Sequence, residues 1–225
     1  MNIKVLYEDN HLIAVLKPVG ILAQGDRSGD INLLDEVKKY LKDKYKKPGN
    51  VFLGLLHRLD RPVSGIILFA KTSKGAARIS EQFRNRLIKK TYHAIVMSEP
   101  KQKKGELINF LEKNRNKRKA ILASSGPNVA ELSYETVLTT EKYSLLKINI
   151  KTGKFHQIRA QLSTAGYPIL GDIKYGAPFP LNDKSIALSA TGLSFQTATT
   201  KEKINLSIPI PDNWNEYLKQ KRQAL

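Results

Sequence analysis

Apolar and polar positions follow two different spacings along this chain, and each spacing predicts regular structure. The apolar run at residues 11–16 predicts a short, fully buried strand that Lys17-Pro18-Val19-Gly20 ends, while residues 7–10 before it read as a turn. From Asn32 the spacing changes to that of a helix, which the break at residues 46–50 closes. The apolar face of this helix is formed by Leu33, Leu34, Val37, Tyr40 and Leu41.

Two further apolar runs, at residues 52–56 and 65–70, predict a pair of buried strands. Residues 57–64 lie between them and are expected to form a connecting loop. A loop held at both ends by core strands is a rigid support for chemistry. Thr72 or Ser73 then caps a second helix. Its buried face is expected to contain Ile79, Phe83 and Leu87.

The second half of the chain reads mainly as strands. A strand is predicted at residues 91–97, and the basic stretch 100–119 is expected to form an exposed arm or hairpin. Period-two alternation at 130–135 and 146–150 predicts half-buried, antiparallel strands. Later elements are a helix over 154–165 ending at Gly166, strands near Ala187 and over 204–208, and a terminal helix packed through Trp214, Tyr217 and Leu218.

Charge suggests the kind of partner. Thirty-eight Lys and Arg residues against twenty Asp and Glu residues give a formal net charge of +18, which exceeds what solubility requires. A polyanion is therefore expected, and nucleic acid fits better than a membrane surface because the cations are spread along the chain. An AT-rich genome that favours lysine could account for part of this excess.

Other classes of protein are disfavoured by what the sequence lacks. No apolar stretch approaches the roughly 20 residues that span a bilayer, and no signal peptide precedes the first elements, so we expect a soluble, intracellular and cytoplasmic protein. The absence of cysteine excludes disulfides, thiolate nucleophiles and cysteine-based metal sites. Four histidines without a His-x-x-x-His pair make a metal site unexpected.

The segment His57-Arg58-Leu59-Asp60-Arg61-Pro62-Val63-Ser64-Gly65 contains the first candidate for chemistry. Cationic neighbours favour the ionised form of a carboxylate, so Asp60 is expected to act as a charged nucleophile or base. An aspartate between two arginines can equally serve only to cap a loop or to form a salt bridge.

Two further segments favour a functional site. In Lys89-Lys90-Thr91-Tyr92 a tyrosine begins a strand after a basic stretch, where its ring could stack on a base. In residues 151–159, His156 and Arg159 are three apart and are expected on one face of a helix, near amides that can bind phosphate. Taken alone, each segment also fits an ordinary strand aromatic or a solvated helix start.

Taken together, these segments resemble the RluA family of pseudouridine synthases. The resemblance spans nearly the whole chain in the family's order. Its motifs are Glu8-Asp9, Lys17-Pro18-x-Gly20, His57-Arg58-Leu59-Asp60, Ser64-Gly65, Ala70-Lys71-Thr72, Lys90-x-Tyr92, Gly153, His156-Gln157-Ile158-Arg159, Gly166, Pro168-Ile169-Leu170-Gly171-Asp172, Tyr175-Gly176, Leu188-x-Ala190 and Leu193-x-Phe195.

The resemblance implies a fold, an activity and a set of residues. It implies an α+β fold, with a mixed, largely antiparallel central sheet, flanking helices and a catalytic cleft, as one catalytic domain over 1–225 without an N-terminal S4 RNA-binding domain. It implies isomerisation of uridine in structured RNA, rRNA or tRNA or both, without a metal or organic cofactor. Asp60 maps to the catalytic aspartate, as nucleophile at C1′ or C6 or as a base. Tyr92 would stack on the uracil, and Arg159 would hold the Asp60 carboxylate. A monomer is the default expectation.

Some positions depart from the family's pattern. Pro62-Val63, Lys154-Phe155 and Ser189 stand where the family often has other residues, and a lysine cannot copy the two-pronged hydrogen bonding of an arginine. These departures affect RNA contacts rather than a catalytic group. The residues expected to bind RNA are Arg58, Arg61, Lys71, Lys90, Lys154 and His156, with Lys89, Arg115, Lys117 and Arg118 as further phosphate contacts.

Two alternatives remain open at this point. A noncatalytic RNA-binding or ribosome-assembly factor could keep the same fold, and a base-excising glycosylase would release free uracil. A metal nuclease is disfavoured because, apart from Asp60 and Asp172, the motifs contain no evident acidic cluster.

Overall fold

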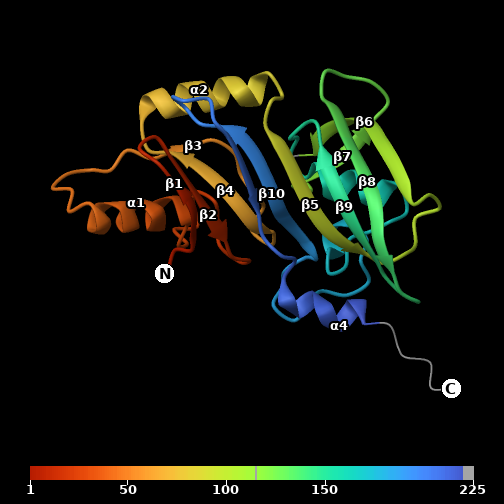
Figure 1. Cartoon of the computed structure of the whole chain (residues 1–225). Coiled ribbons are helices and arrows are strands. Elements are labelled where there is room, and N and C mark those ends of the chain that lie inside the picture. Colours follow the sequence, from red (N-terminus) through yellow and green to blue (C-terminus); the bar gives the residue numbers. More distant parts are fainter. Residues whose placement is uncertain (115, 220–225) are drawn as a thin grey trace. The chain divides into compact units, whose positions relative to one another are not determined.

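The computed structural model describes residues 1–114 and 116–219, which divide into two compact units (Figure 1). Unit 1 comprises Met1–Lys89 and Ala190–Ile208, and unit 2 comprises Lys90–Ser189 and the segment that follows Ile208. The chain therefore leaves unit 1, builds most of unit 2, and returns to complete unit 1.

The sheet of unit 1 has the order β1-β2-β4-β10, in which β2 pairs antiparallel with both β1 and β4. β11 pairs with β10, and the two-residue β3 pairs with β4. The strands are β1 Val5–Glu8, β2 Leu12–Lys17, β3 Gly54–Leu55, β4 Ser64–Ala70, β10 Leu188–Gln196 and β11 Lys203–Ser207.

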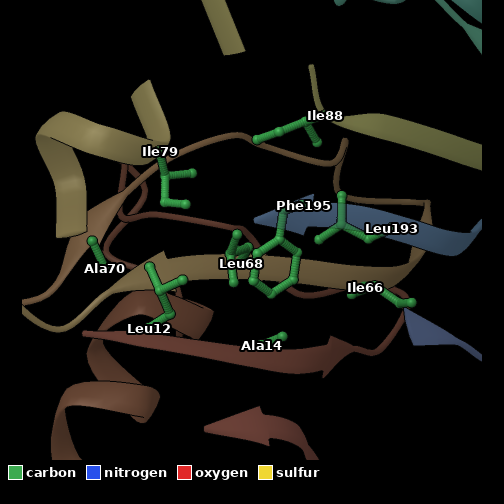
Figure 2. Packing of buried hydrophobic residues seen from close by; sticks show 9 residues of the cluster. All are labelled: Leu12, Ala14, Ile66, Leu68, Ala70, Ile79, Ile88, Leu193 and Phe195. Carbon is green, nitrogen blue, oxygen red and sulfur yellow. The ribbon is translucent and has the colours of Figure 1, made fainter. Parts of the chain in front are cut away.

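Alternate residues of β2 and β4 point to opposite faces, and both faces are buried. On one face the side chains of β2, β4 and β10 pack against Ile79 of helix α2 (Ser73–Arg84), as Figure 2 shows. The cluster consists of Leu12, Ala14, Ile66, Leu68, Ala70, Ile79, Ile88, Leu193 and Phe195. Figure 1 draws helix α1 (Leu33–Lys44) on the other side of these strands. Because both faces are covered, β2 and β4 read as continuous apolar runs rather than as alternating ones.

Both helices of unit 1 begin directly after a residue whose side chain caps them. The Asn32 side chain accepts a hydrogen bond from the Asp35 amide at 3.1 Å, and Thr72 Oγ1 accepts one from the Gly75 amide at 3.0 Å. Each cap satisfies an amide that the first helical turn leaves without a partner. α1 buries Leu33, Val37 and Leu41, as its spacing predicted.

Unit 2 is built on an antiparallel sheet in the order β5-β9-β8-β6-β7. Its strands are β5 Lys89–Val96, β6 Lys104–Asn114, β7 Lys119–Ala123, β8 Val129–Thr139 and β9 Ser144–Ile150. The antiparallel pairing of β8 with β9 confirms the prediction from their alternating residues. The expected arm over 100–119 is a hairpin of β6 and β7, of which β6 is a full strand of the sheet.

The remaining helices of unit 2 are short. α3 spans Gln157–Thr164, η1 Ile173–Tyr175, η2 Asp212–Trp214 and α4 Asn215–Leu218. A small cluster joins α3 to the sheet through Ala160, Leu111, Ala120, Ala130 and Tyr175. The terminal helix packs back as expected: Trp214 is buried, and the Tyr217 ring meets the Tyr143 ring edge-on at 5.8 Å.

Four details correct the sequence prediction. Residues 7 and 8 belong to strand β1 rather than to a turn. The run 52–56 forms only the two-residue β3, and Phe52 is exposed. Leu87 lies beyond the end of α2 and is exposed, because Asn85 already caps that helix. α3 begins at Gln157 instead of residue 154.

Among the helices of the described segments, none combines the length and the apolar character that crossing a bilayer requires.

Candidate active site

The Asp60 loop of unit 1 runs from residue 57 to residue 63, between β3 and β4, and is anchored at several points. The His57 Nε2 accepts a hydrogen bond from the Leu68 amide of β4 at 3.0 Å, and the Val63 amide donates to the Asp60 carbonyl at 3.0 Å. Leu59 and Val63 are buried on either side of Asp60, which is itself half-buried. The backbone of Asp60 is therefore held in a tight turn between two apolar anchors.

A buried ammonium group supports the same loop. Lys17 at the end of β2 is fully buried, and its Nζ donates to the carbonyls of Pro18 at 2.9 Å, Ile21 at 2.7 Å and Arg61 at 3.2 Å. Burial lowers the pKa of Lys17 to about 7, an effect that the Asp60 carboxylate opposes and the Arg61 guanidinium reinforces. Asp60 and Lys17 therefore interact electrostatically, and the ammonium also fixes the backbone next to Asp60.

Arg61 connects the Asp60 loop to the segment after β2 through contacts with Gly20 and Asp30. Its Nε donates to the Gly20 carbonyl at 2.9 Å, its Nη1 lies 2.7 Å from Asp30 Oδ2, and its own carbonyl accepts from the Gly20 amide at 2.9 Å. The guanidinium thus joins the Asp60 loop to the turn after β2, while part of its surface remains exposed.

Gly65, just after the Asp60 loop, lets β4 and β10 approach each other closely. Its φ is +131°, and a Cβ at this position would lie 2.4 Å from the carbonyl oxygen and 2.5 Å from the amide nitrogen of Ala190 in β10. These are backbone atoms that cannot move aside easily. Only glycine allows β4 and β10 to approach this closely while the chain turns out of the Asp60 loop.

In unit 2, Tyr92 lies on β5 opposite Ile148 of β9 and is buried. Lys90, two residues earlier, is half-buried, and burial lowers the pKa of its ammonium group. The Lys90 Nζ lies 3.1 Å from the place where a Cβ of Gly153 would stand, so this glycine leaves room for the lysine.

Arg159 of α3 is held by a carboxylate that sequence reasoning did not assign to it. Its Nε and Nη2 donate to Asp172 Oδ2 at 2.7 Å and Oδ1 at 2.8 Å, and the exposed fractions of the two side chains are 7% and 1%. Such a two-pronged pair fixes the plane of the guanidinium. The guanidinium carbon also lies 5.0 Å from the Tyr175 ring centroid. Asp172 belongs to the Gly171-Asp172 motif, which was the available signal.

His156 does not share a helical face with Arg159 as expected. It precedes α3 in the left-handed conformation, with φ of +50°, because the helix begins only at Gln157. Its Nδ1 lies 2.9 Å from the Tyr175 hydroxyl, which accepts a hydrogen bond from the Ala120 amide at 2.6 Å. His156 is therefore fixed by contacts outside the helix.

Gln157 is a second residue whose part in building the site was missed. Its Oε1 accepts from Thr152 Oγ1 at 2.8 Å and from the Lys154 amide at 3.0 Å, and its Nε2 donates to the Glu131 carbonyl at 3.0 Å. One buried amide side chain thereby shapes the loop before α3 and ties it to β8. Its position within the His156-to-Arg159 motif was the available signal.

The residues expected to bind RNA differ in exposure. Arg58, Arg61, Lys89, Lys117 and Arg118 are exposed, whereas Lys154 is half-buried and donates to Asn128 Oδ1 at 3.2 Å. Lys71 is largely covered: its Nζ lies 2.7 Å from Glu8 Oε1 and donates to the Asp9 carbonyl at 2.7 Å. Arg115 lies outside the described residues. RNA binding by any of them stays a prediction.

The three residues expected to be catalytic are divided between the units: Asp60 belongs to unit 1, and Tyr92 and Arg159 belong to unit 2. Each of them is held by contacts within its own unit. Within residues 1–114 and 116–219, the structure brings together no group of three or more histidine, aspartate or glutamate side chains suited to a metal ion.

Comparison with known proteins agrees with the motifs. The model of the RNA pseudouridylate synthase family matches residues 11–164. A ribosomal large subunit pseudouridine synthase C of Buchnera aphidicola is 32% identical, over 96% of this chain and 69% of the relative. A tRNA pseudouridine synthase C of Haemophilus ducreyi is 33% identical, over 98% of this chain and 96% of the relative.

Among solved structures, human RNA pseudouridylate synthase domain containing 4 superimposes with a TM-score of 0.79 at 25% identity, over 96% of this chain and 91% of that one. The match to the family covers the Asp60 loop, β5 and α3. This chain therefore belongs to the RNA pseudouridylate synthase family, and within it to the RluA type.

Proposed function

We propose that this chain, an RNA pseudouridine synthase by family, isomerises specific uridines of structured RNA with Asp60 as the reacting carboxylate. The observation that carries the proposal is the anchored Asp60 loop, which lies inside the segment that matches the family. A half-buried carboxylate on a backbone fixed by His57, Lys17 and Val63 is already ordered before the substrate arrives. The function of the whole chain is proposed as that of one catalytic domain over 1–225.

The reaction requires the uridine to leave its stack, because its reacting atoms are inaccessible within paired RNA. The bond between N1 and C1′ breaks, the uracil turns, C5 joins C1′, and the proton on C5 is lost while N1 gains one. Asp60 enters as nucleophile at C1′ or C6, or as the base that removes a sugar proton in a glycal route. The product has the same atoms as the substrate, so the chemistry needs neither a redox partner nor water.

The other two catalytic roles are also proposals. Arg159 holds the Asp60 carboxylate ionised and oriented, and its pairing with Asp172 supports this role because it fixes the guanidinium plane in advance. Tyr92 stacks on the uracil and assists removal of the C5 proton. Both roles require these side chains to meet Asp60 around the everted base.

The RNA is proposed to be ribosomal or transfer RNA, in the cytoplasm, bound by a monomer without metal. The charge of +18 supports a polyanionic partner, and the relatives' names cover both RNA classes. Phosphate contacts by exposed arginines and lysines should make the affinity fall steeply with salt. Arg58, Arg61, Lys71, Lys90, Lys154 and His156 remain the proposed RNA contacts.

A pseudouridine map of a deletion strain tests the proposal directly. Carbodiimide labelling of total RNA from the deletion strain should lose one or more sites, which return with the wild-type gene but not with Asp60→Asn. Asp183→Asn, in a loop of unit 2, serves as the matched control and should restore them. If every site persists in the deletion strain, the proposal fails. Restoration by Asp60→Asn would instead favour a noncatalytic RNA-binding factor, and abasic sites would indicate a glycosylase.

A further inference from the structure

Phe155 presents an exposed aromatic ring that is already stacked on a second ring. The residue lies in the loop before α3, and 37% of it is exposed. Its ring centroid is 3.8 Å from that of His156, with an angle of 20° between the planes. A single exposed apolar residue means little by itself. A phenylalanine stacked in parallel on a histidine is a preformed flat surface of two rings.

The His156 ring, on which Phe155 stacks, is held in place by its surroundings. His156 adopts a left-handed backbone conformation that non-glycine residues rarely take, so its surroundings must stabilise it. Its Nδ1 lies 2.9 Å from the hydroxyl of Tyr175, a buried residue that is also bonded to the Ala120 amide of β7. Because the support is ordered in advance, a ligand that stacks on Phe155 loses little entropy in immobilising it.

One ammonium group lies over the Phe155 ring, and further lysines belong to the neighbouring segments. The Lys113 Nζ lies 4.9 Å from the Phe155 centroid, and the Lys119 Nζ lies 5.7 Å from the Tyr175 centroid. Lys154 adjoins Phe155 in sequence, and Lys117 is exposed in the β6–β7 turn. When a base covers the ring, the flexible Lys113 side chain can move from the ring to a neighbouring phosphate, and the other ammonium groups can pair with phosphates as well.

Acidic side chains of β6 do not share this face. Glu112 precedes Lys113 on the strand, and alternation directs the two side chains to opposite faces of the sheet. The surface around Phe155 therefore combines an aromatic platform with lysines. This combination is the one by which proteins bind unpaired nucleic acid, since every base has a face that can stack.

We propose that Phe155, supported by His156, is a stacking platform for an unpaired RNA base, whose neighbouring phosphates are held by Lys113, Lys117 and Lys154. The ligand is single-stranded RNA, because a base inside a duplex has both faces covered by its neighbours. This inference rests on the proposed function for the choice of RNA. It assigns a contact to a residue outside the catalytic set.

Binding of two labelled probes tests the platform. One is a mixed-sequence single-stranded RNA of about 12 nucleotides, and the other is a duplex of the same sequence, both measured by fluorescence anisotropy. Phe155→Leu should weaken binding of the single strand about fivefold or more and leave the duplex unchanged. Phe155→Trp should bind the single strand at least as well as the wild type. Lys113→Gln should weaken both probes and reduce the salt dependence by about one ion.

Phe179→Leu is the matched control, since Phe179 is another exposed phenylalanine of unit 2, 42% exposed. It should change neither affinity. The inference is overturned if Phe155→Leu binds the single strand like the wild type, or if it loses both probes equally. The same wild-type preparation is assayed for pseudouridine in bulk RNA. If Phe155→Leu weakens single-strand binding but the wild-type protein makes no pseudouridine, only the proposed activity is refuted. If the wild-type protein makes pseudouridine but Phe155→Leu binds the single strand normally, only the platform is refuted.

Discussion

Replacing Asp172 with asparagine should destabilise unit 2 much more than the loss of a surface ion pair. Asp172 and Arg159 are 1% and 7% exposed, and two hydrogen bonds of 2.7 and 2.8 Å join them. Asparagine keeps the shape but removes the charge, which leaves the guanidinium buried without this counter-ion. Breaking a buried pair by removing one partner costs about 3–5 kcal/mol, and the amide oxygen of asparagine places the expected loss near 3 kcal/mol. This is a large part of the roughly 5–15 kcal/mol by which proteins are stable.

The fluorescence of Trp214 allows the unfolding of unit 2 to be measured. It is the only tryptophan, it is buried, and it belongs to unit 2, so its fluorescence during urea unfolding reports on that unit. The control is Glu135→Gln, which removes a pair between two exposed side chains, Glu135 and Lys104, and should cost much less because solvent screens the pair. If Asp172→Asn costs no more than Glu135→Gln, the pair does not stabilise unit 2 as argued.

Two further predictions concern unit 1. Gly65→Ala should lower the free energy of unfolding by about 3 kcal/mol or more, measured by urea unfolding followed by circular dichroism, because its Cβ would lie 2.4 Å from a backbone oxygen at a φ of +131°. The control Gly29→Ala, at a φ of +74° with open space around it, should cost only about 1–2 kcal/mol. Equal losses for the two variants would contradict the argument that β4 and β10 approach closely at Gly65. Burial lowers the pKa of Lys17 from 10.5 in the unfolded chain to about 7 in the native protein, so the unfolded chain binds more protons between these values and stability should rise with pH there. Relative to Lys17→Met, the wild-type free energy of unfolding should therefore climb by up to about 1.4 kcal/mol per pH unit above pH 7, and a constant difference would show that Lys17 titrates normally.

Local signals predicted much of the fold because each depends on neighbours in the sequence. Thr72 caps α2 with its own side chain, and helical spacing from Asn32 onward marks the start of α1, so both helix starts could be read from residue type and spacing. Alternation in residues 130–135 likewise revealed β8, whose faces differ in burial. Where local chemistry decides the structure, the sequence pattern is sufficient.

The errors arose where distant contacts decide. His156 looked like part of a helix, but its bond to the Tyr175 hydroxyl accompanies a left-handed conformation that no local pattern announces. Phe52 is apolar yet exposed, since only Gly54 and Leu55 pair with β4. The pairing of Arg159 with Asp172 depends on folding of the chain between them, so the motif indicated that both matter without indicating that they meet.

The interrupted order of unit 1 has a consequence for synthesis of the protein. Leu193 and Phe195 belong to its core, and the Ala190 backbone packs against Gly65. These residues nevertheless leave the ribosome roughly 100 residues after Lys89. At about 5–20 residues per second, residues 1–89 wait on the order of 5–20 s while the edge of β4 that later pairs with β10 is occupied only by the two-residue β3. During that interval the core of unit 1 lacks Leu193 and Phe195, and messages truncated before codon 190 should yield an aggregation-prone fragment.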